Sequence, residues 1–161
     1  MIRIEKLLEE SAEHSATLSL PIDQRVRSRL KVTLDDGQEA GLFLPRGKVL
    51  RDGDLLQSTP GLVIQVVAAP ETVSTVHSTD AYALARACYH LGNRHVPLQI
   101  TAQWVRYQHD HVLDEMIAGL GLSAKMEQAP FEPEAGAYES AAHTHQHNHQ
   151  HNHQHNHEHS H

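Results

Sequence analysis

Histidine is the residue type in this sequence that is best placed to do chemistry. The chain has 161 residues and 16 histidines, and its last nineteen residues carry ten of them at every second position. These ten are His143, His145, His147, His149, His151, His153, His155, His157, His159 and His161. Neutral imidazole suits Ni²⁺, Cu²⁺ and Zn²⁺, so the spaced rings predict a segment that binds several such ions. Its polar spacers cannot build a core, which predicts disorder without metal, and they vary more than the uniform repeat of an engineered tag.

His95 is a second candidate ligand, because it lies at a predicted corner between a helix and a strand. Ser78 or Thr79 can cap a helix over residues 79–91, whose apolar side chains recur at helical spacing. Pro97 prevents further helix, and the alternating residues after it predict a half-buried strand. A polar turn on such a rigid corner is a common place for a functional side chain, although polar residues are also ordinary in loops.

His109 and His111 form a third candidate group, on either side of Asp110 and just before a second predicted helix. If His109 is extended and His111 begins the helix, their two rings could converge on one ion. Asp110 is also a good N-cap residue, and surface histidines beside a cap need no metal. The sequence leaves both interpretations open. The other histidines are isolated and are expected to be ordinary surface or core residues: His14, His77 and His90.

The candidate ligands have to be positioned by two domains. Residues 1–70 predict an all-β domain, because short β-branched or alternating runs are separated by strong turn signals such as Asp35-Asp36-Gly37 and Pro60-Gly61. The candidate strands are 16–20, 27–34, 39–44, 54–57 and 62–68. Arg25, Arg27 and Arg29 alternate there, which predicts a solvated face or a surface for an acidic partner.

From residue 71 the pattern changes to strand, helix, strand, strand, helix, strand. The predicted strands are 73–76, 98–104, 105–108 and 122–127. The helices are 79–91, stopped in a left-handed turn at Gly92-Asn93, and a second helix that begins after Asp110. This order predicts a ferredoxin-like βαββαβ domain over residues 71–129, which makes the fold class α+β. Residues 130–161 are expected to be a linker, tacked down by Phe131 and Tyr138, and then the histidine-rich tail.

Composition excludes several classes of function. A net charge of −7 offers no basic surface for nucleic acid, and no apolar run reaches the roughly 18 residues that span a membrane. Since the first residues also lack a signal-peptide pattern, we expect a cytoplasmic protein. One cysteine, Cys88, excludes an internal disulfide and a multi-thiolate metal site. No nucleophile with a neighbouring base, phosphate-binding loop or His-Glu-x-x-His motif is present, so we expect no catalytic residue and no enzyme.

The stretch Gly92-Asn93-Arg94-His95, followed by Pro97-Leu98-Gln99-Ile100, resembles the signature of the urease accessory nickel metallochaperones, the UreE family. The similarity continues over residues 107–116 and 130–138 and ends in the histidine-rich tail typical of that family. It implies that the second domain forms a homodimer, in which His95 binds the interface metal and Asn93 and Arg94 support the turn. It associates His109 and His111 with secondary sites that accept copper in some members. It also implies that the first domain is similar to a peptide-binding β module of a co-chaperone.

The resemblance therefore predicts a carrier that binds Ni²⁺, and also Cu²⁺ or Zn²⁺, and delivers nickel to apo-urease through an accessory GTPase. The choice of nickel comes from the resemblance, because the affinity of imidazole sites for divalent ions rises toward copper. Two other interpretations remain. The tail could serve a passive store or buffer of nickel, copper or zinc, or the protein could be a peptide-binding co-chaperone that carries a metal-binding tail.

Overall fold

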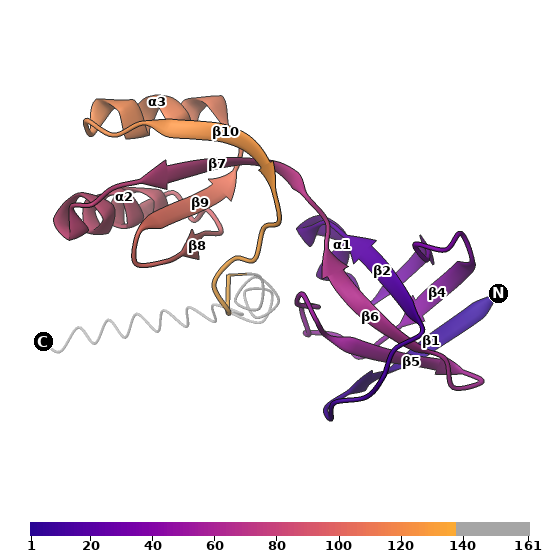
Figure 1. The fold of residues 1–161 in the computed structure, drawn as a ribbon. Helices are drawn as coiled ribbons and strands as arrows, with labels where there is room; N and C mark the ends of the chain where they lie inside the picture. Colours follow the sequence, from indigo (N-terminus) through magenta and orange to yellow (C-terminus); the bar gives the residue numbers. More distant parts are fainter. Residues whose placement is uncertain (138–161) are drawn as a thin grey trace, which may run out of the picture.

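The computed structural model describes residues 1–137 and has two domains, an N-terminal β domain and a C-terminal α+β domain (Figure 1). This layout confirms the predicted fold class. The predictions for Tyr138 and for the ten tail histidines lie outside the described residues. No helix among residues 1–137 is long and apolar enough to cross a membrane.

The N-terminal domain is one six-stranded sheet with a single turn of helix. Its elements are β1 (Ile2–Leu8), β2 (Ala16–Leu20), α1 (Ile22–Arg25), β3 (Arg29–Thr33), β4 (Glu39–Phe43), β5 (Leu55–Thr59) and β6 (Val63–Ala68). The strand order is β2-β6-β5-β1-β4-β3, in which β1 pairs with β4 and β2 with β6 in parallel. The sequence prediction missed β1, because a register shift between Ile4 and Lys6 breaks its alternation.

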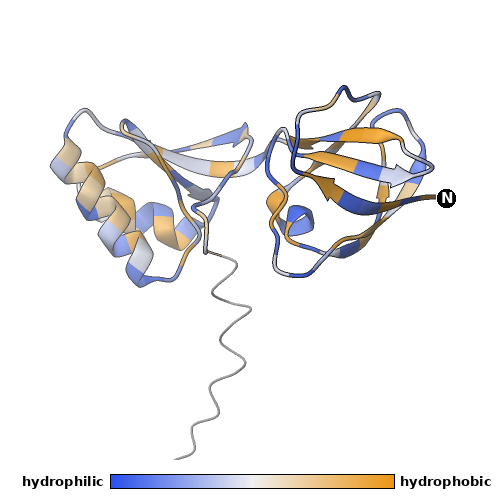
Figure 2. Ribbon diagram, turned by 90° about the horizontal axis from the view of Figure 1, so that it is seen from below, coloured by the Kyte–Doolittle hydropathy of each residue, from blue (hydrophilic) through white to orange (hydrophobic). Residues whose placement is uncertain are grey.

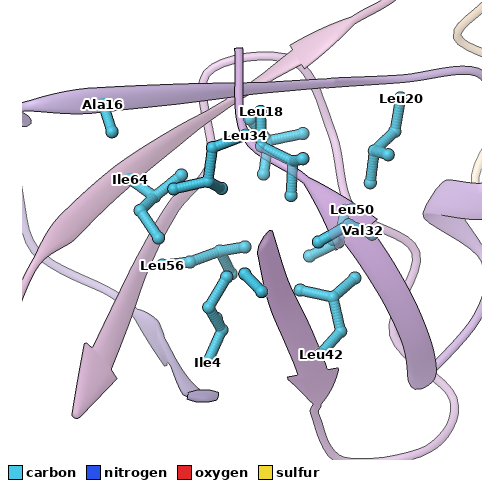
Figure 3. Packing of buried hydrophobic residues seen from close by; sticks show 12 residues of the cluster. Ile4, Ala16, Leu18, Leu20, Val32, Leu34, Leu42, Leu50, Leu56 and Ile64 are labelled. Atoms are coloured by element: carbon cyan, nitrogen blue, oxygen red, sulfur yellow. The ribbon is translucent and has the colours of Figure 1, made fainter. Parts of the chain in front are cut away.

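The sheet curls around an apolar core, and a carboxylate helps to close it. Figure 3 shows inward-facing side chains of several strands meeting in this core, among them Ile4, Leu18 and Leu56. At the tip of the β3–β4 hairpin, Asp35 accepts hydrogen bonds from Thr17 Oγ1 (2.6 Å) and Ser19 Oγ (2.8 Å) of β2. The bond from Thr17 lowers the pKa of Asp35, which stays ionised and holds the two edge strands near each other.

The C-terminal domain has the predicted βαββαβ order. Its elements are β7 (Glu71–His77), α2 (Ala81–Asn93), β8 (Gln99–Ile100), β9 (Trp104–Gln108), α3 (His111–Gly119) and β10 (Ala124–Ala129). The antiparallel sheet runs β10-β7-β9-β8, which is the ferredoxin-like arrangement. Apolar residues of both helices pack on one face of the sheet, and Figure 2 shows the two helices together on that side.

The ends of α2 differ from the prediction. Asp80, and not Ser78 or Thr79, is the N-cap: its carboxylate accepts from Tyr82 N (2.9 Å), while Ser78 Oγ accepts from Asp80 N (3.1 Å). At the other end Gly92 and Asn93 remain helical, and the residue in the left-handed conformation is His95, with φ of 57°. The left-handed stop is therefore correct in kind, but it lies two residues further along the chain than Asn93, where it was predicted.

The predicted strand 98–104 is also too long. Only Gln99 and Ile100 pair with β9, and Thr101 then turns the chain by accepting from Trp104 N (3.0 Å) with its hydroxyl. Because β8 is a short edge strand, Ile100 is 44% exposed, whereas Leu98 before it is buried. The expected half-buried alternation is therefore wrong at Ile100.

Arg25 departs furthest from the sequence prediction. We expected a solvated side chain on a strand face, but α1 turns Arg25 inward and it has no exposed surface. Its guanidinium donates from Nε to Leu20 O (3.0 Å) and from Nη1 to Leu50 O (3.2 Å) and Glu132 Oε1 (2.6 Å). Nη2 donates to Phe131 O. Burial lowers the pKa of Arg25, and the Glu132 carboxylate opposes that shift.

Arg25 thereby holds a segment that follows the C-terminal domain, residues 130–137, which we name the strap. Phe131 of the strap is fully buried with Ile22 and Val73, one from each domain, as its expected anchoring role requires. The strap also accepts from Arg51 Nη1 through the carbonyl of Pro133 (2.6 Å). On the other side the Glu134 N–H donates to Leu98 O (2.7 Å). The strap is thus bonded to both domains.

We predict that Arg25→Met lowers the free energy of unfolding by about 3 kcal/mol or more, because it removes the cation paired with Glu132 and the donor to the buried carbonyls of Leu50 and Phe131. Arg27→Met is the matched control: Arg27 is exposed, and its replacement should change stability by less than about 0.5 kcal/mol. Urea unfolding of the full chain measures both. Equal effects of the two substitutions would contradict the structural role given to Arg25.

Candidate metal-binding site

His95 is exposed and has an unusual backbone conformation. It directly follows the C-cap residue of α2, Arg94, and its N–H donates to Gly92 O (3.0 Å). A positive φ is uncommon outside glycine, although histidine tolerates it better than most residues, and it costs on the order of 1 kcal/mol. Such strain persists where the surrounding structure enforces it and is often found at functional turns. The outlier therefore marks this corner as a candidate site.

The helix that leads to His95 carries an apolar outer surface. Tyr82 is 72% exposed and Tyr89 is 65% exposed, and their seven-residue spacing places both on one side of α2. The guanidinium of Arg86 lies 5.9 Å from the Tyr82 ring centroid, between the two tyrosines in sequence. Two large aromatic side chains exposed on one side of a helix are typical of a surface that receives a partner.

The ring of His109 is held by groups from two elements, β7 and α3. Its Nδ1 lies 3.1 Å from Ser74 Oγ of β7 and 3.2 Å from Asp114 Oδ2 of α3. The other Asp114 oxygen accepts from Tyr107 OH of β9 (2.5 Å). Burial, together with this bond, raises the pKa of Tyr107, so its phenol keeps the proton that it donates.

This arrangement determines which ring nitrogen of the neutral His109 imidazole carries the proton. An ionised carboxylate only accepts hydrogen bonds, so Nδ1 has to carry the hydrogen that points at Asp114. The lone pair of the neutral ring is then on Nε2, which is the nitrogen available to a metal ion. Carboxylates orient metal-binding histidines in this manner in many proteins.

His111 has a different partner from His109. Its Nε2 lies 3.1 Å from Glu115 Oε1, one helical turn further along α3, and both side chains are largely exposed. Asp110 between the two histidines caps α3, because its carboxylate accepts from the N–H groups of Val112 and Leu113. The cap is therefore real, and a shared ion would require the ring of His111 to leave Glu115.

The topology brings the His95 turn and His109 to the same end of the C-terminal sheet. Val73 pairs with Gln108 near that end, and His109 follows directly with its N–H on Thr72 O (3.1 Å). The chain enters β8 from the His95 turn, also at this end, since β8 is antiparallel to β9. The strap reaches the same region, because Glu134 N donates to Leu98 O.

The described residues do not complete a metal site in one chain. Within residues 1–137, no three histidine, cysteine, aspartate or glutamate side chains are placed to hold one ion. Cys88 of α2 is half-buried, and its burial, together with the charge of Glu134, raises its pKa, so the thiol stays protonated. Within residues 1–137 of one chain, His95 is therefore not part of such a group.

Two parts of this site were missed by the sequence analysis. The seven-residue spacing of Tyr82 and Tyr89 was visible in the sequence, but the predicted helix was judged only by its buried side. Ser74 and Asp114 could not be linked to His109 before the fold was known, because they lie on β7 and α3 and meet it only in space.

The fold and these side chains define a two-domain protein that presents imidazole side chains at one end of a ferredoxin-like scaffold. The family model of the UreE urease accessory protein N-terminal domain matches residues 3–69, and that of its C-terminal domain matches residues 71–161. The chain belongs to the UreE family of urease accessory proteins, as the sequence resemblance predicted.

Individual relatives are similar over most of their length. A urease accessory protein UreE from Pseudomonas putida (strain W619) is 59% identical over 145 residues, which cover 89% of this chain and 90% of that protein. The protein of the same name from Alkalilimnicola ehrlichii is 59% identical over 138 residues, covering 86% and 85%. That from Escherichia coli O157:H7 (strain EC4115 / EHEC) is 53% identical over 146 residues, covering 90% and 95%.

We predict that Asp114 fixes the tautomer of His109. In the metal-free protein above pH 7.5, the ring nitrogen shifts of His109 should report the Nδ1–H form, and Asp114→Asn should give a mixture of the two forms, because the carboxylate that demands a proton on Nδ1 is gone. Two-dimensional ¹H–¹⁵N NMR of the ring nitrogens measures this. Glu115→Gln is the control and should leave His109 unchanged; a mixed tautomer in the native protein would contradict the assignment.

Proposed function

We propose that this chain is a homodimeric nickel carrier for urease maturation in the cytoplasm. It collects Ni²⁺ on the histidine tail, holds the ion at a site formed by His95 of two chains, and passes it toward apo-urease through an accessory GTPase. The observation that carries this proposal is the exposed His95 on a strained, left-handed corner, at the end of a helix with two exposed tyrosines. Family membership supports the link to urease.

Two considerations support the pairing of two chains: the number of ligands that an ion requires and the exposed tyrosines of α2. One imidazole holds a divalent ion weakly, so a labile site needs at least a second ring. Most soluble homo-oligomers are symmetric dimers, and packing α2 on its copy would bury Tyr82 and Tyr89. A twofold axis near the end of α2 would then bring two copies of His95 together.

The strap supports a role for the tail at the same site. Glu134 is bonded to Leu98, which is three residues after His95. His143 follows Ala137 by six residues, which is at most about 20 Å of extended chain. Tail histidines can therefore supply further ligands near the paired site. His109 and His111 would serve as secondary sites for Ni²⁺ or Cu²⁺, because Nε2 of His109 is the free nitrogen.

Nickel is cargo in this proposal, so binding must be reversible. Imidazoles exchange one at a time, and a partner that offers better-arranged ligands takes the ion stepwise. An incomplete site in each chain favours such exchange, because no fixed cage has to open. No residue of the chain is assigned a catalytic role.

We predict that the paired site is distinct from the tail. Truncation after Ala142 should reduce the number of bound Ni²⁺ ions but keep one tight site for two chains, and His95→Ala in the truncated protein should abolish that site. The physical reason is that rings on rigid corners lose less entropy on binding than a flexible segment does.

Isothermal titration calorimetry with analytical ultracentrifugation measures both the stoichiometry and the dimer. His77→Ala is the matched control, since His77 is exposed at the opposite end of β7 and should leave the shared site intact. A shared tight site that survives His95→Ala would overturn the assignment.

A passive store of metal is the second candidate function, and the ten tail histidines favour it. The two functions differ in what added nickel can repair. If the tail only raises the local supply of ligand, its loss matters when nickel is scarce and fades when nickel is plentiful. The His95 corner, in contrast, lies on the delivery route at every nickel concentration.

We therefore predict that, in a urease activation assay, added Ni²⁺ largely rescues the variant truncated after Ala142 but rescues His95→Ala less well. His77→Ala should activate urease like the unaltered protein. Equal rescue of the truncated and His95→Ala variants at modest nickel would favour the store over the carrier.

A further inference from the structure

The N-terminal domain has a group of cationic side chains around one aromatic ring, which the metal-carrier function does not use. Four cationic side chains surround Phe43 of β4, and we name this group the cationic face. They are Arg3 of β1, Arg27 just before β3, and Arg29 and Lys31 of β3. The guanidinium carbon of Arg3 lies 4.1 Å from the Phe43 ring centroid and that of Arg29 lies 5.9 Å from it. Most of these residues line one shallow hollow in the surface.

The register of three strands builds this face. Gly41 of β4 pairs with Arg3 on one side and with Lys31 on the other, and Phe43 pairs with Arg29. A Cβ atom on Gly41 would lie 2.8 Å from Phe43 Cε2, so the ring lies over the glycine. Because Gly41 has no side chain, the Phe43 ring can lie on the sheet between the cationic side chains of β1 and β3.

The charge of the face is opposite to that of the protein. The chain has a net charge of −7, yet four of its 13 lysines and arginines gather here. Glu5 pairs with Arg3 (2.9 Å), but both side chains are about half exposed and such a pair is weak. An acidic partner would be repelled by most of this protein and attracted to this surface, which orients its approach.

The edge of β3 adds a backbone feature to the charges. Leu34 N donates to Gln38 O and Leu44 N to Ser28 O, so even-numbered residues of β3 bond to β4. The backbone groups of Arg29 and Lys31 therefore point away from β4, and β3 has no second partner strand within residues 1–137. The chain beyond β3 does contact β2, since Asp35 N donates to Thr17 O (3.0 Å), so the free edge is confined to β3 itself. An extended chain can pair with such an edge.

We propose that the cationic face binds an extended, acidic segment of a partner protein, which lies along β3 and places carboxylates on Arg29 and Lys31. Arginine forks match carboxylates in a bidentate manner, and the Phe43 ring receives an apolar side chain between them. A phosphate polymer is disfavoured, because four cations on a protein of net charge −7 give it little attraction beyond the face. A membrane surface is also disfavoured, because Met1 is the one large apolar side chain lining the hollow that is largely exposed and could enter lipid.

Fluorescence anisotropy of the metal-free full chain tests this proposal. The probe is a fluorescein-labelled ten-residue peptide that alternates glutamate with valine. The control peptide has lysine in place of each glutamate. We expect saturable binding of the acidic peptide that weakens as ionic strength rises, and no saturable binding of the lysine peptide. An acidic peptide N-methylated at every residue has no backbone N–H group to donate to the edge of β3 and should bind about tenfold more weakly. Equal binding of the acidic and lysine peptides, or of the methylated and plain acidic peptides, would overturn the proposal.

Two double variants separate the face from general electrostatics. Arg29→Glu with Lys31→Glu should weaken binding of the acidic peptide by about tenfold or more, because both carboxylate partners are reversed. Arg46→Glu with Lys48→Glu changes the net charge equally on the exposed turn after β4 and should weaken it by less than about twofold. Phe43→Leu keeps every charge and should weaken it by about threefold through loss of the ring. Thermal unfolding confirms that each variant is folded.

Other outcomes would overturn the proposal. Equal losses in the two double variants would show only a general effect of charge. Polyphosphate or phosphatidylserine vesicles that bind more tightly than the peptide, and lose binding with Arg29→Glu and Lys31→Glu, would assign the face to phosphate groups. Charged residues on an edge strand can also serve only to prevent aggregation; a variant that self-associates but binds the peptide as before would show this.

Discussion

The hydrogen bonds of the buried Arg25 guanidinium connect the strap to the N-terminal domain, and the arrangement of the two domains depends on them. A charge without solvent is costly unless it is paired and hydrogen-bonded, and each of the three guanidinium nitrogens of Arg25 donates to an acceptor among the carbonyls of Leu20, Leu50 and Phe131 and the carboxylate of Glu132. These acceptors come from three separate segments of the chain. Arg25 therefore stabilises one arrangement of them, in which the strap crosses from the C-terminal domain to the β domain.

The strap held by Arg25 also contacts the candidate metal site. The strap that accepts from Arg25 also donates from Glu134 to Leu98, and Leu98 lies just beyond the left-handed turn of His95. A positive φ at a histidine needs support from the structure around it, and here α2 precedes the turn and the Leu98 anchor follows it. One buried cation thereby influences the support of the His95 turn.

The sequence predicted the βαββαβ domain because its helices and turns have strong local signals, and it predicted most strands of the β domain. It failed where tertiary contacts decide the outcome. The alternation of Arg25, Arg27 and Arg29 indicates a solvated face in any local analysis, and only the one-turn helix α1 sends Arg25 inward. Likewise, Ser78 is a good cap by type, but it bonds to Asp80 and leaves the capping position to that residue. His95 was predicted as a candidate site residue from its motif, whereas the contacts of His109 required the fold.

The two kinds of candidate ligand in the C-terminal domain differ physically in a way that suits different tasks. His109 is oriented by Ser74 and Asp114, and Asp114 is held in turn by Tyr107. Because the ring of His109 is already fixed, its Nε2 would bind a metal ion with a smaller loss of entropy. His95 is fixed mainly through its backbone, by the bond from its N–H to Gly92, and its ring is exposed. A fixed, carboxylate-supported ring favours retention of an ion. An exposed ring on a rigid corner favours exchange, because it can reach an ion held by another chain and release it without breaking bonds inside its own domain. By this argument the His95 corner is better suited to delivery, and the His109 position to retention.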